Sequence, residues 1–414
     1  MNAMKRPLLL LLAIVVLGAG GYAGWILSSS DPVGRLPRWV QLRPSIYLDT
    51  ALDRIQQHAF GRATVDWNAV RAGAKEMSAG AASTEDTYLA IRSVLNRLPD
   101  HLSVLATPPP VPTNGHSYGL QVLFPDRVVA LVYPGSAAAA AGIRPGDIVE
   151  SVEEHPPIVN HDARARGYFI DIPPPRTTLH VRTPTGAVRD VPLEISTLSL
   201  LPADTHRIGT DVGYVLMPGT SGSSEFVDAV RAGIARADAP TVCGWIVDLR
   251  ADTGGSMWPM LQAIRAIVGE APIGFSIDAG GARTPWAYPT DAAGVKPLAH
   301  PRGPVAVLTS RLTAGAAEGV LVALRGRPEV RTFGEPTWGT PTTTESFALA
   351  DGAILQLTES FDADRAGVEY QTRIPPDQAM PIDWARLGAP DDAIVVAAGT
   401  WLRSQPACAK KGGQ

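Results

Sequence analysis

The chain has 414 residues, which is enough for two or three domains with cores of their own. Its formal net charge is −4, and its basic residues occur only in short runs, so nucleic acid is not an expected partner. The 37 Pro and 40 Gly are dispersed along the chain, which indicates many turns and no single disordered linker.

An uncharged, mostly apolar run occupies residues 7–27, directly after Lys5 and Arg6. Such a run can cross about 30 Å of hydrocarbon as a helix, and basic residues before it favour a cytoplasmic N-terminus. We therefore expect residues 1–30 to be a signal anchor in the inner membrane, with the soluble part in the periplasm or outside the cell. A cleaved signal peptide, which would give a secreted protein, is the alternative.

The two cysteines of the chain lie in different surroundings: Cys243 in an apolar strand pattern and Cys408 in a polar tail. This difference predicts two unpaired thiols. We therefore expect an exported protein that does not depend on a disulfide.

The first soluble segment shows helical periodicity. After a linker over residues 31–45, amphipathic stretches begin near Ile46, near Val65 and after a capping sequence at Ser83. They predict an N-terminal helical domain over residues 46–108, which ends in a Pro-rich break.

Residues 115–200 change to short β-type runs separated by turns. The run SAAAAAGIRPGDIV within them resembles the helix, turn and strand of a circularly permuted bacterial PDZ domain. The resemblance implies that a peptide adds as a strand beside a groove, and a PDZ fold that acts only as a spacer is the alternative. The N–H groups that would receive the peptide's C-terminal carboxylate belong to Tyr118, Gly119, Leu120, Gln121 and Val122.

Residues 205–404 alternate between strand and helix patterns, which predicts an α/β domain followed by a tail over residues 405–414. The expected strands cover residues 212–217, 245–249, 305–309, 330–333 and 353–357. The expected helices cover residues 224–236, 257–268, 316–325 and 391–402.

The order of helical block, PDZ-like domain and α/β core resembles the C-terminal-processing (tail-specific) serine peptidase family, which has a ClpP/crotonase-like core. The resemblance covers nearly all of the chain after residue 30, and it implies peptides or unfolded-protein C-termini as partners. The motifs that carry it occur in this order along the chain: VDWNAV, AGIRPGD, VDLRADTGG, FGEPTWGT and LADGAILQLT.

The nucleophile and the base of that family are not matched. Acyl transfer needs an activated hydroxyl, a base and donors aimed at the developing oxyanion. The family turn reads Thr-Ala-Ser-x-x-Glu, and matching Thr313 and Glu318 places Gly315 at the serine. One branch uses a lysine 25 positions later, where this chain has Thr340.

The tricorn-like branch takes its base from an Asp-x-His-Ser motif after the helical block. Matching Asp100 and Ser103 places Leu102 at the histidine, with His101 one residue early. His101 is therefore either a displaced base or a turn histidine. Glu345 matches the carboxylate that orients the histidine in that branch, or it is an exposed strand residue.

The oxyanion donors that the resemblance implies are still present. Gly254 and Gly255 end the VDLRADTGG motif and permit close backbone approach, although an ordinary glycine turn is the alternative. Ala316 follows the nucleophile position and would supply the second N–H. Other serines are typical of caps and turns, namely Ser221, Ser223, Ser224, Ser256 and Ser310.

Three functions follow as hypotheses. The first is an exported, anchored relative of tail-specific peptidases that recognises peptides or protein C-termini, with hydrolysis lost or weak. The second is an active serine peptidase with a rearranged site. The third is an apolar small-ligand binding protein, as in retinoid-binding relatives of the same core, for which Met257, Trp258 and Trp338 would suit a pocket.

We expect no metal and no cofactor. The eight histidines are scattered along the chain, without the spacing of a ligand set. No phosphate-binding loop or dinucleotide fingerprint occurs.

Overall fold

The computed structural model describes residues 37–100, 102–106, 116–123, 125–153, 176–197, 202–219, 222–289, 295–301 and 303–409. The predicted membrane segment at residues 7–27 and His101 lie outside these ranges. No helix within the described ranges is both long enough and apolar enough to cross a membrane. The chain forms two compact units: residues 1–108 with 345–357, and residues 109–344 with 358–414.

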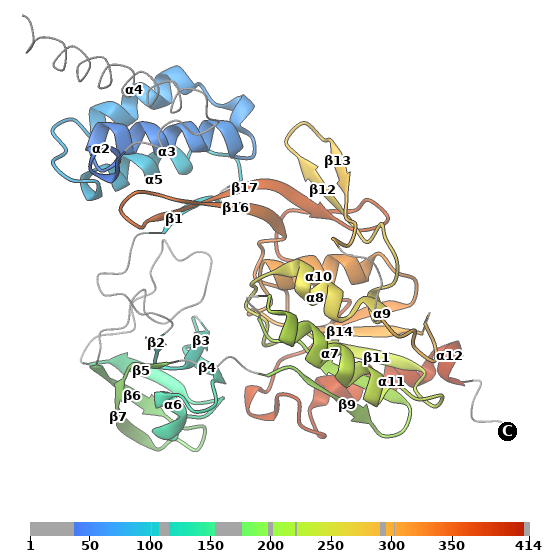
Figure 1. The fold of residues 1–414 in the computed structure, drawn as a ribbon. Helices are drawn as coiled ribbons and strands as arrows, with labels where there is room; N and C mark the ends of the chain where they lie inside the picture. The colour runs from blue at the N-terminus through green and yellow to red at the C-terminus, as the bar shows by residue number, and fades with distance from the viewer. Residues whose placement is uncertain are drawn as a thin grey trace, which may run out of the picture. The chain divides into compact units, whose positions relative to one another are not determined.

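The first unit contains helices where the amphipathic pattern predicts them (blue in Figure 1). Helix α3 buries Leu48, Leu52 and Ile55 against Ile91 and Val94 of α5. A short helix, α2, lies within the segment expected to be a linker. The helices are α2 (Arg38–Gln41), α3 (Pro44–His58), α4 (Trp67–Met77) and α5 (Tyr88–Leu95), with 3₁₀ helices at Arg62–Thr64 and Glu85–Thr87.

A single carboxylate joins this helical layer to a strand turn within the same unit. The hydroxyls of Tyr47 and Tyr88 donate to the two oxygens of Asp351 at 2.9 and 2.8 Å. Asp351 lies in the turn between β16 (Thr342–Ala348) and β17 (Ile354–Ala363). Strand β1 (Val104–Ala106) pairs antiparallel with the first residues of β17, so the LADGAILQLT motif is part of this unit's core.

A six-stranded sheet forms the centre of the second unit. Its order is β19-β15-β14-β11-β10-β9, parallel except for the antiparallel edge strand β9. Strands β11 and β14 are buried along their whole length, as is typical of parallel strands covered on both faces. The strands are β9 (Asp204–Ile208), β10 (Val212–Leu216), β11 (Gly244–Asp248), β14 (Val305–Thr309), β15 (Val330–Gly334) and β19 (Gln378–Ala379).

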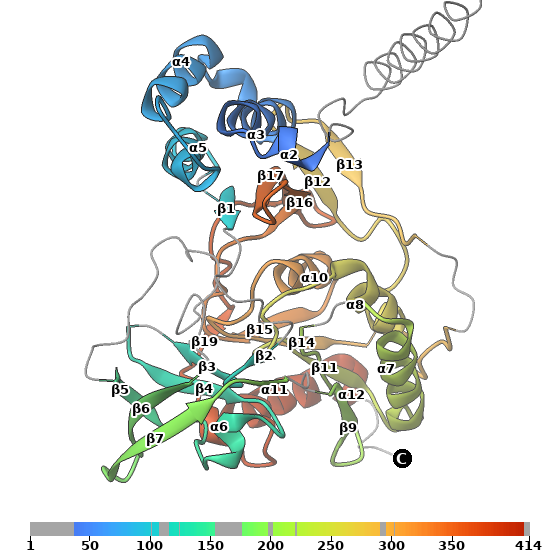
Figure 2. The same ribbon diagram turned by 60° about the vertical axis from the view of Figure 1, so that its left-hand side comes forward.

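Helices cover both faces of this sheet (Figures 1 and 2). Val247 and Val307 pack on one face with Val230 of α7 and Val320 of α10. The opposite face packs against α11, as the contact of Leu308 with Leu402 and its neighbours shows. The helices are α7 (Ser224–Ala237), α8 (Met257–Ala263), α9 (Arg265–Val268), α10 (Ala316–Arg325), α11 (Ala393–Ser404) and α12 (Pro406–Ala409), with a 3₁₀ helix at Trp384–Arg386.

Two helix predictions need correction at their bounds. The helix expected over residues 257–268 is divided, because Ile264 has φ −103° and ψ 19°, outside the helical region. The last helix begins at Ala393, since Asp392 caps it by accepting from the N–H of Ile394 at 3.0 Å. The helix expected over residues 316–325 has the predicted bounds.

A second sheet of this unit, which the sequence pattern did not predict as such, includes the later part of β17. Strand β12 (Phe275–Asp278) pairs with β17 and with β13 (Arg283–Pro285), and β18 (Glu369–Tyr370) pairs with β17 on its other side. This sheet brings Asp362 of β17 toward the N-terminal turn of α10. An added Cβ on Gly319 of that turn would lie 3.5 Å from an oxygen of Asp362.

The β-rich segment forms an antiparallel sheet in the order β3-β4-β5-β6-β7, with α6 (Ala137–Ala140) beside it. Its core contains Val122, Val129, Val149, Leu179 and Val181. The strands are β3 (Leu120–Leu123), β4 (Val128–Val132), β5 (Ile148–Val152), β6 (Arg176–Arg182) and β7 (Val188–Glu194), and a separate pair joins β2 (His116–Ser117) to β8 (Ser196–Thr197).

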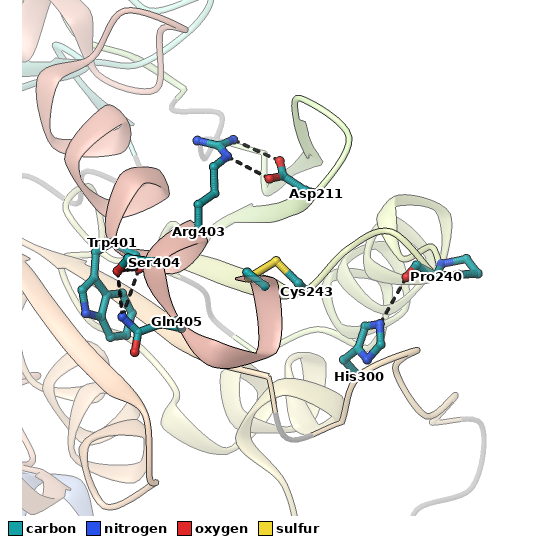
Figure 3. Close-up of a disulfide and its surroundings, with 9 residues drawn as sticks. Asp211, Pro240, Cys243, His300, Trp401, Arg403, Ser404 and Gln405 are labelled. Atoms are coloured by element: carbon teal, nitrogen blue, oxygen red, sulfur yellow. Dashed lines mark hydrogen bonds and ion pairs between the residues drawn. A yellow bond between two sulfur atoms is a disulfide. The ribbon is translucent and has the colours of Figure 1, made fainter. Parts of the chain in front are cut away.

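The prediction of two unpaired thiols is wrong, because Cys243 and Cys408 form a disulfide (Figure 3). Helix α12 returns the C-terminal segment to the start of β11, which brings the two Cα atoms to 5.1 Å, within the range that a disulfide spans. Arg403 and Asp211 form two hydrogen-bonded ion-pair contacts nearby, at 2.8 and 3.0 Å. The C-terminal helices are therefore held to the sheet both covalently and by charge.

Candidate active site

The strand-to-helix turn at Gly315 lies between β14 and α10. Gly315 is the residue before the first helical residue and has φ 52° and ψ −110°, a conformation that L side chains adopt only under strain. A nucleophile on such a sharp turn is exposed to substrate. A Cβ added at Gly315 would have one neighbour within 4 Å, the hydroxyl oxygen of Thr340 at 4.0 Å. Positions 315 and 340 are therefore direct neighbours.

Glu318 fixes the geometry of this turn. Its buried carboxylate accepts from the N–H groups of Gly315, Gly339 and Thr340 at 2.8 to 2.9 Å. It also accepts from the hydroxyls of Thr337 and Thr340 at 2.5 and 3.0 Å. Burial raises the pKa of Glu318, and these donors partly offset the rise. One acidic side chain thus connects the start of α10 to the loop that follows β15.

Thr340 links Glu318 to the backbone of Gly315 through its hydroxyl. Its hydroxyl donates to Glu318 and accepts from the N–H of Gly315 at 3.1 Å. A threonine hydroxyl is a much weaker base than the neutral amine of a lysine side chain. Thr340 therefore holds the turn together and cannot take up a proton from a nucleophile.

The glycine turn after β11 meets the Gly315 turn. Gly254 has φ 101°, and a Cβ there would lie 3.0 Å from the carbonyl oxygen of Ala314 and 3.8 Å from the nitrogen of Ala316. Ala316 begins α10, so its N–H is one of the groups that lack an intrahelical acceptor. The N–H of Gly254 donates to Asp252 at 3.0 Å, which directs this predicted oxyanion donor into its own turn. Gly255 follows it with φ 127°.

Two buried carboxyls near these turns, Asp252 and Asp362, form no ion pair with a cation of the described residues. Burial raises the pKa of Asp252 well above its usual range. The pKa of Asp362 is raised in the same way by burial and by the nearby charge of Glu318. One oxygen of each side chain has no hydrogen-bond partner among the described residues. Both groups therefore favour the neutral acid form.

The other hydroxyls near the turn serve the backbone. Ser310 is fully buried and donates to the carbonyl of Arg250 at 2.7 Å, and Thr313 donates to that of Leu249 at 2.9 Å. Ser223 caps α7 by accepting from the N–H of Phe226. Ser256 precedes α8, and Ser221 lies outside the described residues. The hydroxyls of Ser310, Thr313 and Ser223 are therefore engaged with the backbone.

The Asp-x-x-Ser segment of the first unit is an ordered turn. Asp100 accepts from the N–H groups of Leu102 and Ser103, both at 2.7 Å, and from the Ser103 hydroxyl at 3.1 Å. Leu102 is half-buried in this turn. His101, the residue of the displaced-base hypothesis, lies outside the described residues.

Glu345 is an exposed residue of β16 that pairs with a histidine the sequence did not single out. Its carboxylate lies 3.2 Å from Nδ1 of His58 at the end of α3, within the first unit. The ring of Phe347 lies 4.6 Å from that of His58. Nothing in the sequence spacing signalled His58, because the pair joins α3 to a strand almost 300 residues later.

The loop predicted to receive a peptide carboxylate is mostly buried. Tyr118 is 4% exposed, Leu120 8% and Val122 not at all. The N–H of Tyr133 and the hydroxyl of Ser136 both donate to the carbonyl of Gly119. Burial and the charge of Glu153 raise the pKa of Tyr118 to about 12. Residues 154–175, which connect β5 to β6, lie outside the described ranges.

The parallel sheet, the strand-to-helix turn at Gly315 and the adjoining glycine turn define a serine-type peptidase core. The model of peptidase family S41 matches residues 211–380, which include both turns. The chain therefore carries a peptidase family S41 domain, as the resemblance to C-terminal-processing peptidases predicts.

The relatives agree with this assignment. The chain is 26% identical over 329 residues to carboxyl-terminal-processing peptidase 2 of the Arabidopsis thaliana chloroplast, over 72% of this chain and 61% of that protein. It is 26% identical over 354 residues to a carboxyl-terminal-processing protease of Synechocystis, over 79% of each. The solved photosystem II D1 C-terminal processing protease shares the fold, with a TM-score of 0.59, 19% identity, and coverage of 84% of this chain and 96% of that one.

Proposed function

We propose that this protein is an exported relative of carboxyl-terminal-processing peptidases that binds peptides or protein C-termini and has lost efficient hydrolysis. The observation that carries the proposal is the pair Gly315 and Thr340. They face each other at the turn where a peptidase of this kind holds its nucleophile and base. Leu102 at the histidine position of the other branch leaves that route without a base as well.

Binding is favoured by the parts of the site that remain. The turn keeps its conformation through Glu318, and open space remains above Gly315. The N–H of Ala316 at the start of α10 and that of Gly255 are the donors we assign to a peptide carbonyl. Helix N-termini and consecutive N–H groups favour partially negative oxygens. A PDZ role for the β-rich segment would add a second contact with the same peptide.

Export is supported by the Cys243–Cys408 disulfide, since such bonds persist mainly in oxidising compartments. The apolar run at residues 7–27 after Lys5 and Arg6 has the sequence of a signal segment. We propose an anchored protein with its soluble part in the periplasm or outside the cell. N-terminal sequencing of the protein from membrane and soluble fractions tests this, and a mature chain that starts after residue 28 would contradict the anchor.

Two measurements on the purified wild-type chain test the chemistry. A fluorophosphonate probe is expected to leave it unlabelled, and titration calorimetry with peptides that have free apolar C-termini is expected to show binding. Labelling that disappears when one serine is replaced would contradict the loss of hydrolysis. Absence of any peptide affinity would contradict the binding function.

A further inference from the structure

An exposed arginine lies beside the loop that carries Thr340. Arg373 precedes the buried Ile374, and its guanidinium lies over the ring of Trp338 at 5.9 Å from the ring centre. It forms no ion pair or hydrogen bond with any side chain of the described residues. An exposed cation on an aromatic face is a ready receptor for a carboxylate.

The hydrogen bonds around Glu318, which shape the Gly315 turn, also fix the backbone next to Arg373. Thr337 donates through its hydroxyl to Glu318, and the N–H of Ile374 donates to that hydroxyl oxygen at 2.8 Å. The N–H of Thr337 returns a bond to the carbonyl of Ile374 at 3.1 Å. The backbone at Arg373 is therefore held in register with the loop that bears Thr340.

Close packing limits how far Arg373 can move from this loop. A Cβ on Gly339 would lie 2.9 Å from its Cγ and 3.1 Å from its backbone nitrogen. Gly339 has φ 107°, a conformation that favours glycine. The backbone N–H of Trp338 donates to the carbonyl of Thr313 at 2.9 Å, which holds this residue to the segment before Gly315. Trp338 thus lies two residues before the loop position that faces Gly315, and Arg373 packs against Gly339, the residue between them.

We propose that Arg373 and Trp338 recognise the C-terminal end of a peptide held at the Gly315 turn. The guanidinium receives the terminal carboxylate, and the indole contacts the apolar side chain next to it. The acids near the turn do not compete for Arg373, because Glu318 is buried among five donors. This inference rests on the proposed binding function and specifies its ligand as a free peptide C-terminus.

The test uses one fluorescein-labelled decapeptide with an apolar C-terminal residue, made with a free carboxylate and as the C-terminal amide. Fluorescence anisotropy measures both against the wild type, Arg373→Gln and Arg331→Gln. Arg331 is a matched control, since it also lies over an aromatic ring, that of Phe333, at 5.5 Å. We expect the wild type and Arg331→Gln to bind the acid about tenfold more tightly than the amide. Arg373→Gln is expected to bind both alike.

The remaining outcomes of this experiment distinguish failure of the inference from failure of the binding function. If Arg373→Gln keeps the preference for the acid, the carboxylate is received elsewhere and this inference is overturned, while the binding function stands. If the wild type binds acid and amide equally, the inference is overturned in the same way. If the wild type binds neither peptide, the proposed binding function fails and this inference fails with it.

Discussion

At the scale of single residues, the site is organised around acids and not around a nucleophile. Glu318 accepts from five donors in two segments of chain, the Gly315 turn and the loop of residues 337–340, which explains why the turn keeps its shape although Gly315 has no hydroxyl. Thr340 shares this network and lies beside Gly315, at the position that the resemblance assigns to the base. The shape of the turn therefore has a structural explanation that does not depend on a nucleophile.

The Thr340 hydroxyl should contribute to stability. Replacing it by Thr340→Val removes a donor to Glu318 and an acceptor for the Gly315 N–H, and we expect a loss of about 1–3 kcal/mol in unfolding free energy. Thr340→Ser keeps the hydroxyl and is the matched control. Urea unfolding of both variants measures the difference. Equal stability of the Val variant and the wild type would show that the network does not hold the turn.

The raised pKa of Asp362 predicts that the free energy of unfolding depends on pH. Its pKa is raised in the folded chain by burial and by Glu318, so the native state retains a proton that the unfolded chain loses above its ordinary pKa of about 3.9. The stability from this group is complete below that value and falls by about 1.4 kcal/mol per pH unit until the folded pKa is reached. Asp362→Asn removes this fall. Urea unfolding at pH 5 and pH 8 should therefore show a smaller decline for the variant, and parallel declines would contradict the assignment.

At the scale of elements, hydrophobic patterns predicted the strands and helices whose bounds are set by nearby residues. The strands at residues 305–309 and the helix at 316–325 have the predicted bounds, because both are long apolar patterns bounded by clear turn residues. The break at Ile264 and the sheet around β12 were missed, since neither leaves a strong local signal. The pairs Cys243–Cys408 and His58–Glu345 could not be found from spacing, because tertiary folding alone brings their partners together.

The attachment of α11 and α12 depends on the disulfide. Cys408→Ser releases a covalent link that closes 165 residues of sequence, and removal of such a link costs about 2–4 kcal/mol. We expect a lower melting temperature for the variant under oxidising conditions. The control is the wild type with reductant, which should melt like the variant. Identical melting of oxidised wild type and variant would show that Arg403 and the α11 core suffice.

At the scale of the whole molecule, the two compact units contain different residues that the sequence singles out. The second contains the S41 match except for residues 345–357, and it contains both turns at Gly315 and Gly254. The first contains the Asp100 turn and Glu345, which match the histidine branch of the family only at its flanking positions. We propose from these positions that both catalytic routes of the family lack their reactive residues in this chain.

The most direct test of this account restores those residues. The double variant Gly315→Ser, Thr340→Lys places a hydroxyl and an amine at neighbouring positions, since the Thr340 hydroxyl already lies 3.1 Å from the Gly315 nitrogen. We compare it with wild type and with Gly315→Ser alone, using fluorophosphonate labelling and cleavage of an unfolded protein substrate. We expect no turnover by the wild type, little by the single variant, and labelling with measurable cleavage by the double variant. Cleavage by the wild type at a rate equal to that of the double variant would contradict it.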